Sequence, residues 1–438
     1  MRTTITVREY ARLTTEPVVA SMDRAQVSAS AFDWLCKLNA SFSRKGASLL
    51  QVEGRQWLRL DNYVGVLETP CGTCLEILPK HTEREDCPVT TRALLRKMIQ
   101  AALNLPTRNA GVAALELYDA PLSEWVIRRF LEELDYLVKR GIRFDYQRVE
   151  EERSSLRGQL NLVAQIRQPP GRQHFFQVRH DVFVPDRAEN RLLKLAVERI
   201  CKATQDATNW RLAHELRSLM LEVPVSRLPS EDFRQWRADR LMAHYQPVKP
   251  WCELVLGQHM PLAVAGDWQG VSLLFPMEKI FERYVAATLA KELAPGAKLI
   301  TQKASEYLCT HCDSPFFRLE PDLYIQQGKK SWVLDTKWKR LDINDQKGRY
   351  GLSQGDFYQL FAYGHKYLPD GKGELILIYP KRSVFAEALS VFDFGGGLTL
   401  RVLPFDLEAG QLVDAVGTSL PMKRDGQYLE GCRHERTS

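Results

Sequence analysis

The stretch that decides the fold of the C-terminal third is EPDLYIQQGKKSWVLDTKW, residues 320–338. It contains two apolar runs separated by a polar turn at residues 327–330, a pattern that predicts a β-hairpin. Side chains alternate along a strand, so Asp335 and Lys337 share one face of the second strand. Asp322 begins the first strand, opposite the end of the second. We therefore expect the two carboxylates and the lysine to meet at one end of the hairpin.

This set of side chains suits phosphodiester hydrolysis. A metal ion activates water and offsets phosphate charge, Mg²⁺ prefers oxygen ligands, and a lysine can stabilise developing charge. The Asp-x-Lys spacing recurs at Asp345–Lys347 and Asp370–Lys372, but both lie in turns rich in Gly and Asp. Only the pair Asp335 and Lys337 lies in an apolar strand. Burying charged groups there is unfavourable, so their presence favours a functional role. A strand-end salt bridge is the alternative explanation.

The residues around this hairpin predict an α/β core with a buried central sheet. A following helix carries Gln359 and Tyr363, which are four residues apart and so share a helix face. The amide could hold a ligand or a phosphate, and the alternative is an ordinary amphipathic helix with polar edges. The expected elements, in chain order, are a helix at 277–293, strands at 316–319, 323–326 and 331–337, a helix at 356–367 and a closing strand at 374–379.

The whole chain is expected to have a mixed α/β fold in three parts. Residues 1–90 read as a small β-rich domain with one helix, and residues 91–260 as a mainly helical middle domain in which residues 122–140 form the strongest helix. Residues 261–438 carry the nuclease motifs. The chain has 438 residues, 45% of them hydrophobic, and a formal net charge of +6. This mild excess permits a polyanionic partner without demanding one.

Several functional classes are disfavoured by the composition. The nine cysteines are scattered along the chain, which is not typical of a disulfide-bonded secreted protein. We expect neither a signal peptide nor a membrane-spanning helix. A cytoplasmic location is therefore expected. The pairs Cys71-x-x-Cys74 and Cys309-x-x-Cys312 fall in different expected domains, so we expect no zinc. The G-x-S-x-G match at 351–355 lacks the preceding strand of a nucleophile elbow. No G-x-x-x-x-G-K-[ST] loop occurs, so no nucleotide is expected to bind this chain.

The chain also resembles a known family. Its C-terminal motifs resemble those of the RecB-type branch of PD-(D/E)xK nucleases and, more specifically, of the McrC family, the nuclease subunits of McrBC modification-dependent restriction systems. The resemblance implies a PD-(D/E)xK core in the C-terminal domain. The segments that carry it are Pro321-Asp322, Asp335-Thr336-Lys337, Gln359-x-x-x-Tyr363, residues 5–14, 65–80, 156–160 (LRGQL), 186–193 (DRAENRLL), 276–285 (PMEKIFERYV) and 353–363 (SQGDFYQLFAY).

The resemblance implies roles for individual residues. Asp322 and Asp335 match the metal-binding acids, Lys337 matches the catalytic lysine, and the carbonyl of Thr336 is a further candidate ligand for Mg²⁺. Glu282 is a weaker candidate because related nucleases often place a glutamate on the preceding helix, and a solvated helix charge is its alternative explanation.

The resemblance also implies partners. A separate AAA+ GTPase ring, similar to McrB, would hydrolyse GTP and recognise the modified base, of the 5-methylcytosine type, in double-stranded DNA. The N-terminal β-rich domain and the helical middle would dock on that ring. Two other functions remain open: an adaptor that activates the GTPase through an inert nuclease fold, and a stand-alone RecB-like repair nuclease. A gene for an AAA+ protein next to this one would separate these possibilities.

Overall fold

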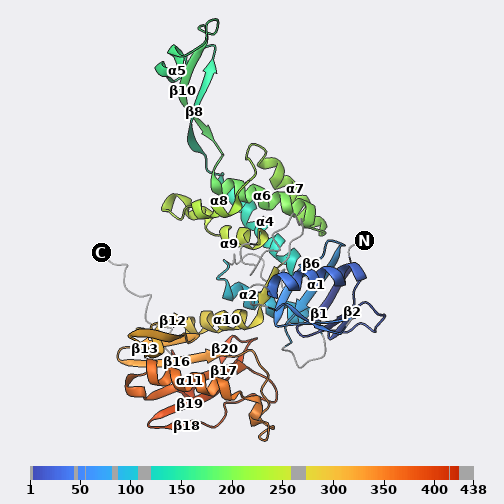
Figure 1. The fold of residues 1–438 in the computed structure, drawn as a ribbon, viewed down its shortest axis with the longest axis vertical. Helices are drawn as coiled ribbons and strands as arrows, with labels where there is room; N and C mark the ends of the chain where they lie inside the picture. Colours follow the sequence, from blue (N-terminus) through green and yellow to red (C-terminus); the bar gives the residue numbers. More distant parts are fainter. Residues whose placement is uncertain are drawn as a thin grey trace, which may run out of the picture. The chain divides into compact units, whose positions relative to one another are not determined.

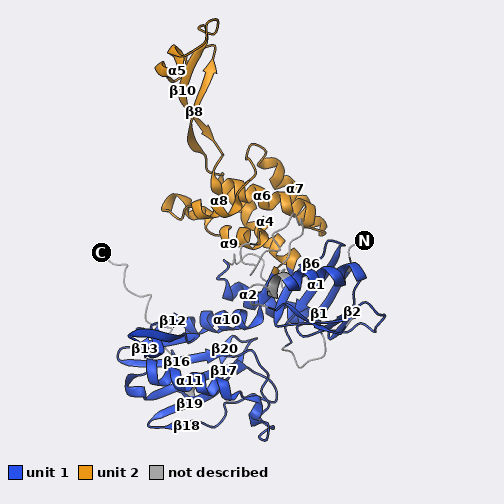
Figure 2. Ribbon diagram, viewed as in Figure 1, with its two compact units in different colours: residues 1–122, 274–438 blue, residues 123–273 orange. Residues whose placement is uncertain are grey.

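The contacts within the chain group it into two compact units. Unit 1 comprises residues 1–122 and 274–438, and unit 2 comprises residues 123–273 (Figure 2). The N-terminal strands and the C-terminal sheet therefore share one unit. The predicted division into three domains, with boundaries near residues 90 and 260, stays a prediction. The computed structural model describes residues 3–43, 48–54, 56–80, 87–106, 120–257, 273–413 and 415–423.

The C-terminal part of unit 1 is a mixed sheet with the strand order β12-β15-β16-β17-β19-β18 and β20 beside β19 (Figure 1). The predicted hairpin is confirmed, because β15 and β16 pair antiparallel from Leu323 opposite Leu334. β16, β17 and β19 run parallel, with helix α11 connecting β16 to β17. The elements are α10 Met277–Glu292, β12 Lys298–Thr301, β15 Leu323–Gln327, β16 Lys330–Thr336, α11 Gln354–Tyr367, β17 Gly373–Pro380, β18 Phe392–Gly395, β19 Leu398–Asp406 and β20 Gln411–Leu412.

The prediction that the strand at 374–379 closes this unit is wrong. β19 pairs with β17 over eight residue pairs, from Gly373 opposite Leu398 to Pro380 opposite Phe405. This pairing makes β17 a central strand, and its residues from Leu375 onward are fully buried. A separate hairpin, β13 Glu306–His311 with β14 Ser314–Leu319, precedes β15.

The N-terminal part of unit 1 is β-rich, as predicted. One sheet has the order β1-β7-β6-β11, and a smaller one has the order β3-β2-β5-β4. Every residue of β6, Tyr63–Glu68, is buried, and the buried residues of this region form part of the core of unit 1. The elements are β1 Thr3–Arg8, β2 Arg12–Thr14, β3 Arg24–Gln26, α1 Ala29–Ser43, β4 Leu50–Glu53, β5 Trp57–Leu60, β6 Tyr63–Glu68, β7 Thr73–Leu78, α2 Pro88–Ala102 and β11 Leu273–Pro276.

Unit 2 is a group of helices that carries a β-arm (Figure 1). The expectation of a mainly helical middle is therefore incomplete. The helix predicted at 122–140 is observed at those bounds and ends before Gly141, whose φ is +94°. No helix among the described residues is long and apolar enough to cross a membrane. The helices are α4 Leu122–Arg140, α6 Ala188–Ala203, α7 Ala207–Leu219, α8 Pro229–Gln235 and α9 Lys249–Val255.

The arm, residues 145–184, is a long antiparallel ribbon. Its strands β8 Asp145–Arg153 and β10 Phe176–Val184 pair over nine residue pairs, and β9 Gln159–Leu160 adds a short third strand. Helix α5 Leu162–Ile166 lies at its outer end (Figure 1). The arm escaped prediction because the sequence of β8, DYQRVEEER, has almost no apolar face to signal a strand.

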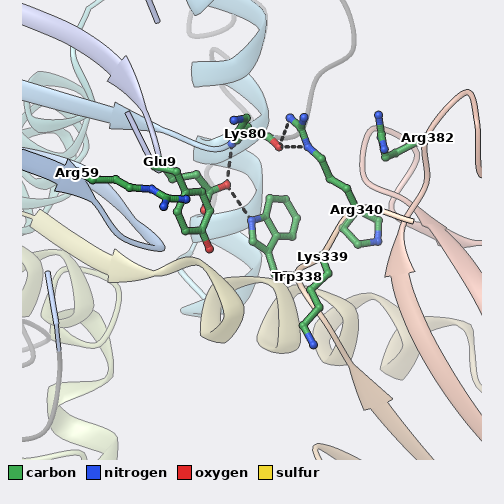
Figure 3. Close-up of a pocket in the computed structure, with 9 residues that line it drawn as sticks. Glu9, Arg59, Lys80, Trp338, Lys339, Arg340 and Arg382 are labelled. Carbon is green, nitrogen blue, oxygen red and sulfur yellow. Dashed lines mark hydrogen bonds between the residues drawn. The ribbon is translucent and has the colours of Figure 1, made fainter. Parts of the chain in front are cut away.

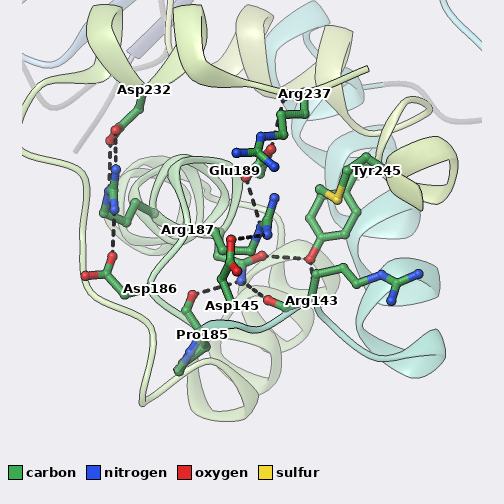
Figure 4. Close-up of polar contacts among 12 residues, drawn as sticks. Arg143, Asp145, Pro185, Asp186, Arg187, Glu189, Asp232, Arg237 and Tyr245 are labelled. Atoms are coloured by element: carbon green, nitrogen blue, oxygen red, sulfur yellow. Dashed lines mark hydrogen bonds and ion pairs between the residues drawn. The ribbon is translucent and has the colours of Figure 1, made fainter. Parts of the chain in front are cut away.

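Two segments that resemble the McrC family shape this arm. In LRGQL, Gly158 has a φ of +72°, and a Cβ there would lie 2.6 Å from the carbonyl oxygen of Arg179 on β10. Only glycine allows this close approach. In DRAENRLL, Arg187 pairs with Asp145 at 2.7 Å, and Asn190 donates to the carbonyl of Pro185 at 2.9 Å (Figure 4). These contacts fasten both strands of the arm to helix α6.

A buried carboxylate joins the N-terminal sheet to the segment after β16. Glu9 follows β1 and is 1% exposed. Its Oε1 accepts hydrogen bonds from the backbone N–H of Lys80 at 2.7 Å and from the indole N–H of Trp338 at 2.8 Å (Figure 3). Burial raises the pKa of Glu9 to about 7, although these two hydrogen bonds work in the opposite direction.

The raised pKa of Glu9 predicts a pH-dependent stability. The folded state holds the proton more tightly than the unfolded state, so stability is lost as pH rises from about 4.5 to 7, by about 3 kcal/mol in full. Glu9→Gln removes this loss and keeps an acceptor oxygen. Urea unfolding should therefore show the variant gaining about 2–3 kcal/mol relative to wild type between pH 5 and pH 8. Glu387→Gln, at an exposed position, should show no such gain, and an equal response in both variants would contradict the assignment.

Candidate active site

The β15–β16 hairpin places two acidic side chains next to each other. Leu323 is paired with Leu334, so Asp322 and Asp335 are the next residues at the same end of the ladder. The Oδ2 atom of Asp322 accepts hydrogen bonds from the backbone N–H and the hydroxyl of Thr336, both at 2.8 Å. The structure thus shows Thr336 fixing the orientation of Asp322, a contact that the sequence did not suggest.

Asp335 is the most strongly perturbed acid of this cluster. It is 2% exposed, and burial, followed by the nearby charge of Asp322, raises its pKa to about 7. The Nζ atom of Lys337 lies 2.6 Å from its Oδ2 and opposes this rise. Burial works to lower the pKa of Lys337, but the carboxylates around it raise the pKa overall. A lysine paired with a partly protonated acid is an arrangement typical of functional sites.

Helix α11 brings the predicted polar pair to the same place. The Nζ atom of Lys337 lies 3.5 Å from Oε1 of Gln359, and Nε2 of Gln359 donates to the hydroxyl of Tyr363 at 2.7 Å. The hydroxyl of Tyr363 donates in turn to the carbonyl of Glu320, just before Asp322, at 3.0 Å. The pair therefore connects Lys337 to the start of β15.

Glu282 on helix α10 is buried, so its interpretation as a solvated helix charge is wrong. It is 5% exposed, and burial followed by the charge of Asp322 raises its pKa. Lys279 donates to it at 2.7 Å and Gln302 at 3.0 Å. The backbone N–H of Gln302 donates in turn to the carbonyl of Asp322 at 2.9 Å, so Gln302 links Glu282 to the start of β15.

One acidic residue of the cluster was missed in the sequence. Asp356, in the first turn of α11, is 9% exposed, and its Oδ2 lies 3.1 Å from Nζ of Lys339. Its charge contributes to the raised pKa values of Asp335 and Tyr379. The signal was present in the segment SQGDFYQLFAY, but an aspartate at a helix start is ordinarily explained by the helix dipole.

The donor set of this cluster suits a hard divalent cation. Asp322 and Asp335 offer carboxylate oxygens, and burial, followed by the charge of Asp322, raises the pKa of Asp335 to about 7. A bound cation would favour the ionised form of Asp335. Among the described residues, no group of three or more His, Cys, Asp or Glu side chains has the spacing of a metal cage. Mg²⁺ needs only one or two carboxylates because it keeps several waters.

Comparisons with known proteins bear on the fold and on the family. Two of the similar solved structures contain related chains. One is a half-complex from a tetradecameric assembly of Thermococcus gammatolerans McrB AAA+ hexamers with bound McrC, with a TM-score of 0.69 and 22% identity over 92% of this chain and 95% of that chain. The other is the Thermococcus gammatolerans McrBC complex, with a TM-score of 0.52 and 23% identity over 66% of this chain and 88% of that chain. These likenesses show the fold, and the predicted mixed α/β class is confirmed.

A comparison with curated proteins gives no match. The family model described as "McrBC 5-methylcytosine restriction system component" matches residues 58–380, which is well over half of the chain and includes every candidate site residue. The chain therefore belongs to the family of McrBC 5-methylcytosine restriction system components.

Proposed function

We propose that this chain is the endonuclease subunit of a modification-dependent restriction system and cleaves DNA by metal-assisted phosphodiester hydrolysis. One observation carries the proposal: Asp335, a buried acid with its pKa raised to about 7, lies beside Asp322 and 2.6 Å from Lys337 at the end of an apolar strand. An inert adaptor would not need this costly arrangement. The cluster therefore favours a nuclease over the adaptor alternative.

Each residue of the cluster has a distinct role in this proposal. Asp322, Asp335 and the carbonyl of Thr336 would hold Mg²⁺, which when bound supplies charge neutralisation and an acidified water. The ammonium group of Lys337 faces the phosphate and stabilises the charge that develops on it. Gln359 and Tyr363 hold Lys337 and the start of β15 in position. With these roles the cluster would be a PD-(D/E)xK nuclease site.

The proposal predicts that cation binding depends on pH. A carboxylate must be deprotonated to bind a metal, and Asp335 holds its proton up to a pKa of about 7. The apparent affinity for Mn²⁺, used as a probe for Mg²⁺, should rise by about fivefold from pH 6 to pH 7 and about tenfold from pH 6 to pH 8, and level off above pH 8. Calorimetric titration of the full chain measures this. An affinity that stays constant from pH 6 to pH 8 would contradict the role of Asp335.

The partner is proposed from the solved relatives and from the arm. One relative is a McrC bound to McrB AAA+ hexamers, and we propose that this chain likewise binds an AAA+ GTPase ring. The outer end of the arm exposes several apolar side chains that the rest of unit 2 does not cover. Exposed apolar surface of this kind is typical of an interaction surface. We propose that the arm contacts the ring. The exposed apolar residues near its outer end are Leu156, Leu162, Val163 and Ile166.

A further inference from the structure

A cavity of about 370 Å³ lies in unit 1, where the carboxyl ends of two pairs of parallel strands meet. Glu9 and Lys80 follow the ends of the pair β1 and β7, whereas Arg340 and Arg382 follow the ends of the pair β16 and β17 (Figure 3). Crevices at the carboxyl ends of parallel strands are where open α/β sheets bind ligands. We call this space the basic cavity, and its charged lining residues are Glu9, Arg59, Lys80, Lys339, Arg340 and Arg382.

The charges that line the basic cavity favour an anion. Its lining contains five cationic side chains and one carboxylate, Glu9, whose pKa of about 7 leaves it partly neutral at physiological pH. Arg59 and Lys80 each also lie 3.8 Å from a carboxylate outside the lining, so the excess of positive charge is greatest at the two arginines that follow β16 and β17. Burial, followed by the positive charges of Arg382 and Arg8, lowers the pKa of Arg340. A cation that is destabilised by its cationic neighbours would be stabilised by a bound anion.

Arg340 is held ready for such a ligand. Its Nε and Nη2 atoms donate to the carbonyl oxygen of Lys80 at 3.0 and 2.6 Å (Figure 3). These bonds fix the plane of the guanidinium group before any ligand arrives, so little conformational freedom is lost on binding. Arginine also matches the geometry of phosphate oxygens better than lysine does.

The basic cavity adjoins the candidate active site along the chain. Its lining residues Trp338 and Lys339 directly follow Lys337. Lys339 forms an ion pair with Asp356, whose charge contributes to the raised pKa of Asp335. The basic cavity and the candidate site are therefore formed in part by consecutive residues, an arrangement that suits two neighbouring phosphates of one strand.

We propose that the basic cavity binds a backbone phosphate of the DNA strand whose neighbouring phosphate is cleaved. The inference rests on the proposed nuclease function and adds a second site at which this chain contacts the DNA backbone. A cavity at the small end of ligand sites, which run from about 300 to 1,000 Å³, suits one phosphate with its sugar rather than a length of duplex. Such a contact positions the strand and carries no sequence information.

The test is a binding measurement that needs no catalysis. A fluorescent duplex is titrated with the full chain in EDTA over a range of KCl concentrations. The double variant Arg340→Gln/Arg382→Gln should bind about tenfold more weakly for each arginine removed. The slope of log Kd against log salt should fall by about 1 for each lost phosphate contact. Arg340→Lys, which keeps the charge, should recover part of both effects and guards against a folding defect.

The matched control is Lys329→Gln, which removes an exposed charge in the turn before β16, at the opposite end of the strand. It should leave affinity and salt slope unchanged. If the double variant behaves like this control while wild type binds and cuts DNA, the basic cavity is not a phosphate site and the proposed function stands. If wild type binds no duplex DNA in this assay and also fails to cut modified duplex DNA with Mg²⁺, partner and GTP, both proposals fail. Tight binding of a fluorescent GTP analogue that is lost in the double variant would reassign the cavity to a nucleotide phosphate.

Discussion

Asp335→Asn and Lys337→Ala are each expected to lower the rate of DNA cleavage by the complete assembly by a factor of about 10²–10³ or more. Asp335 would lose its charge at the metal, and Lys337 its charge at the phosphate. Neither change should unfold the chain. Asp335 is buried with its pKa raised to about 7, so its ionised form is costly in the folded state. Asp335→Asn should therefore match or exceed the thermal stability of wild type at pH 8.

The chain supplies its own matched controls for these two variants. Asp345 and Lys347 repeat the Asp-x-Lys spacing in an exposed turn, where Oδ1 of Asp345 accepts from the backbone N–H of Gly348 at 2.8 Å. Asp345→Asn keeps that acceptor, and Lys347→Ala removes a solvated charge. Both controls should cut at the wild-type rate. Site variants that cut as fast as these controls would show that the cluster is only a structural salt bridge.

Shortening the arm is expected to uncouple the chain from its AAA+ partner. Arg153 and Phe176 face each other across the β8–β10 ladder, so residues 154–175 can be replaced by an Asn-Gly turn without breaking the pairs below. The exposed apolar residues at the outer end would be lost. Binding to the ring should weaken by about 10–100-fold, and GTP-dependent cleavage should fall accordingly. Binding is measured by pull-down with purified partner, and cleavage on modified DNA with and without GTP.

The same experiment distinguishes the arm, which lies in the middle part of the chain, from the N-terminal β-rich part. The family resemblance implied docking through both parts. Deleting residues 1–90 is not a clean test, because Glu9 bonds to Trp338 and its removal would disturb the segment after β16. The exposed Val52 on β4 offers a milder change, Val52→Asp. Full binding by the arm variant and weak binding by Val52→Asp would move the docking surface to the N-terminal strands. Rapid cleavage by the lone chain without GTP would favour the repair-nuclease alternative.

The hairpin and its site residues could be predicted because their signals are local. The apolar runs around the turn at 327–330 fix the register, and a register fixes which side chains meet, as Asp322 and Asp335 do. Gln359 and Tyr363 share a face of α11 because helical periodicity is regular. In these cases the local sequence pattern is sufficient to predict which side chains lie close together.

Other features depend on contacts between distant segments, which periodicity does not report. Nothing near Glu9 in the sequence indicates that its carboxylate is buried, because its hydrogen-bond partners Lys80 and Trp338 lie far away in the chain. The arm was missed because its strands gain stability from each other through cross-strand pairs rather than from a hydrophobic face. The ion pair between Arg179 and Glu150 is one such pair.

The most direct test of the central claim joins metal binding to cleavage in the same preparations. Wild type, Asp335→Asn and the control Asp345→Asn are titrated with Mn²⁺ at pH 8 by electron paramagnetic resonance. Each is then assembled with partner and GTP on modified duplex DNA under single-turnover conditions. We expect wild type and the control to bind Mn²⁺ and to cut, and Asp335→Asn to do neither while remaining folded. Wild-type Mn²⁺ affinity or a wild-type cleavage rate in Asp335→Asn would contradict the assignment of this cluster as the nuclease site.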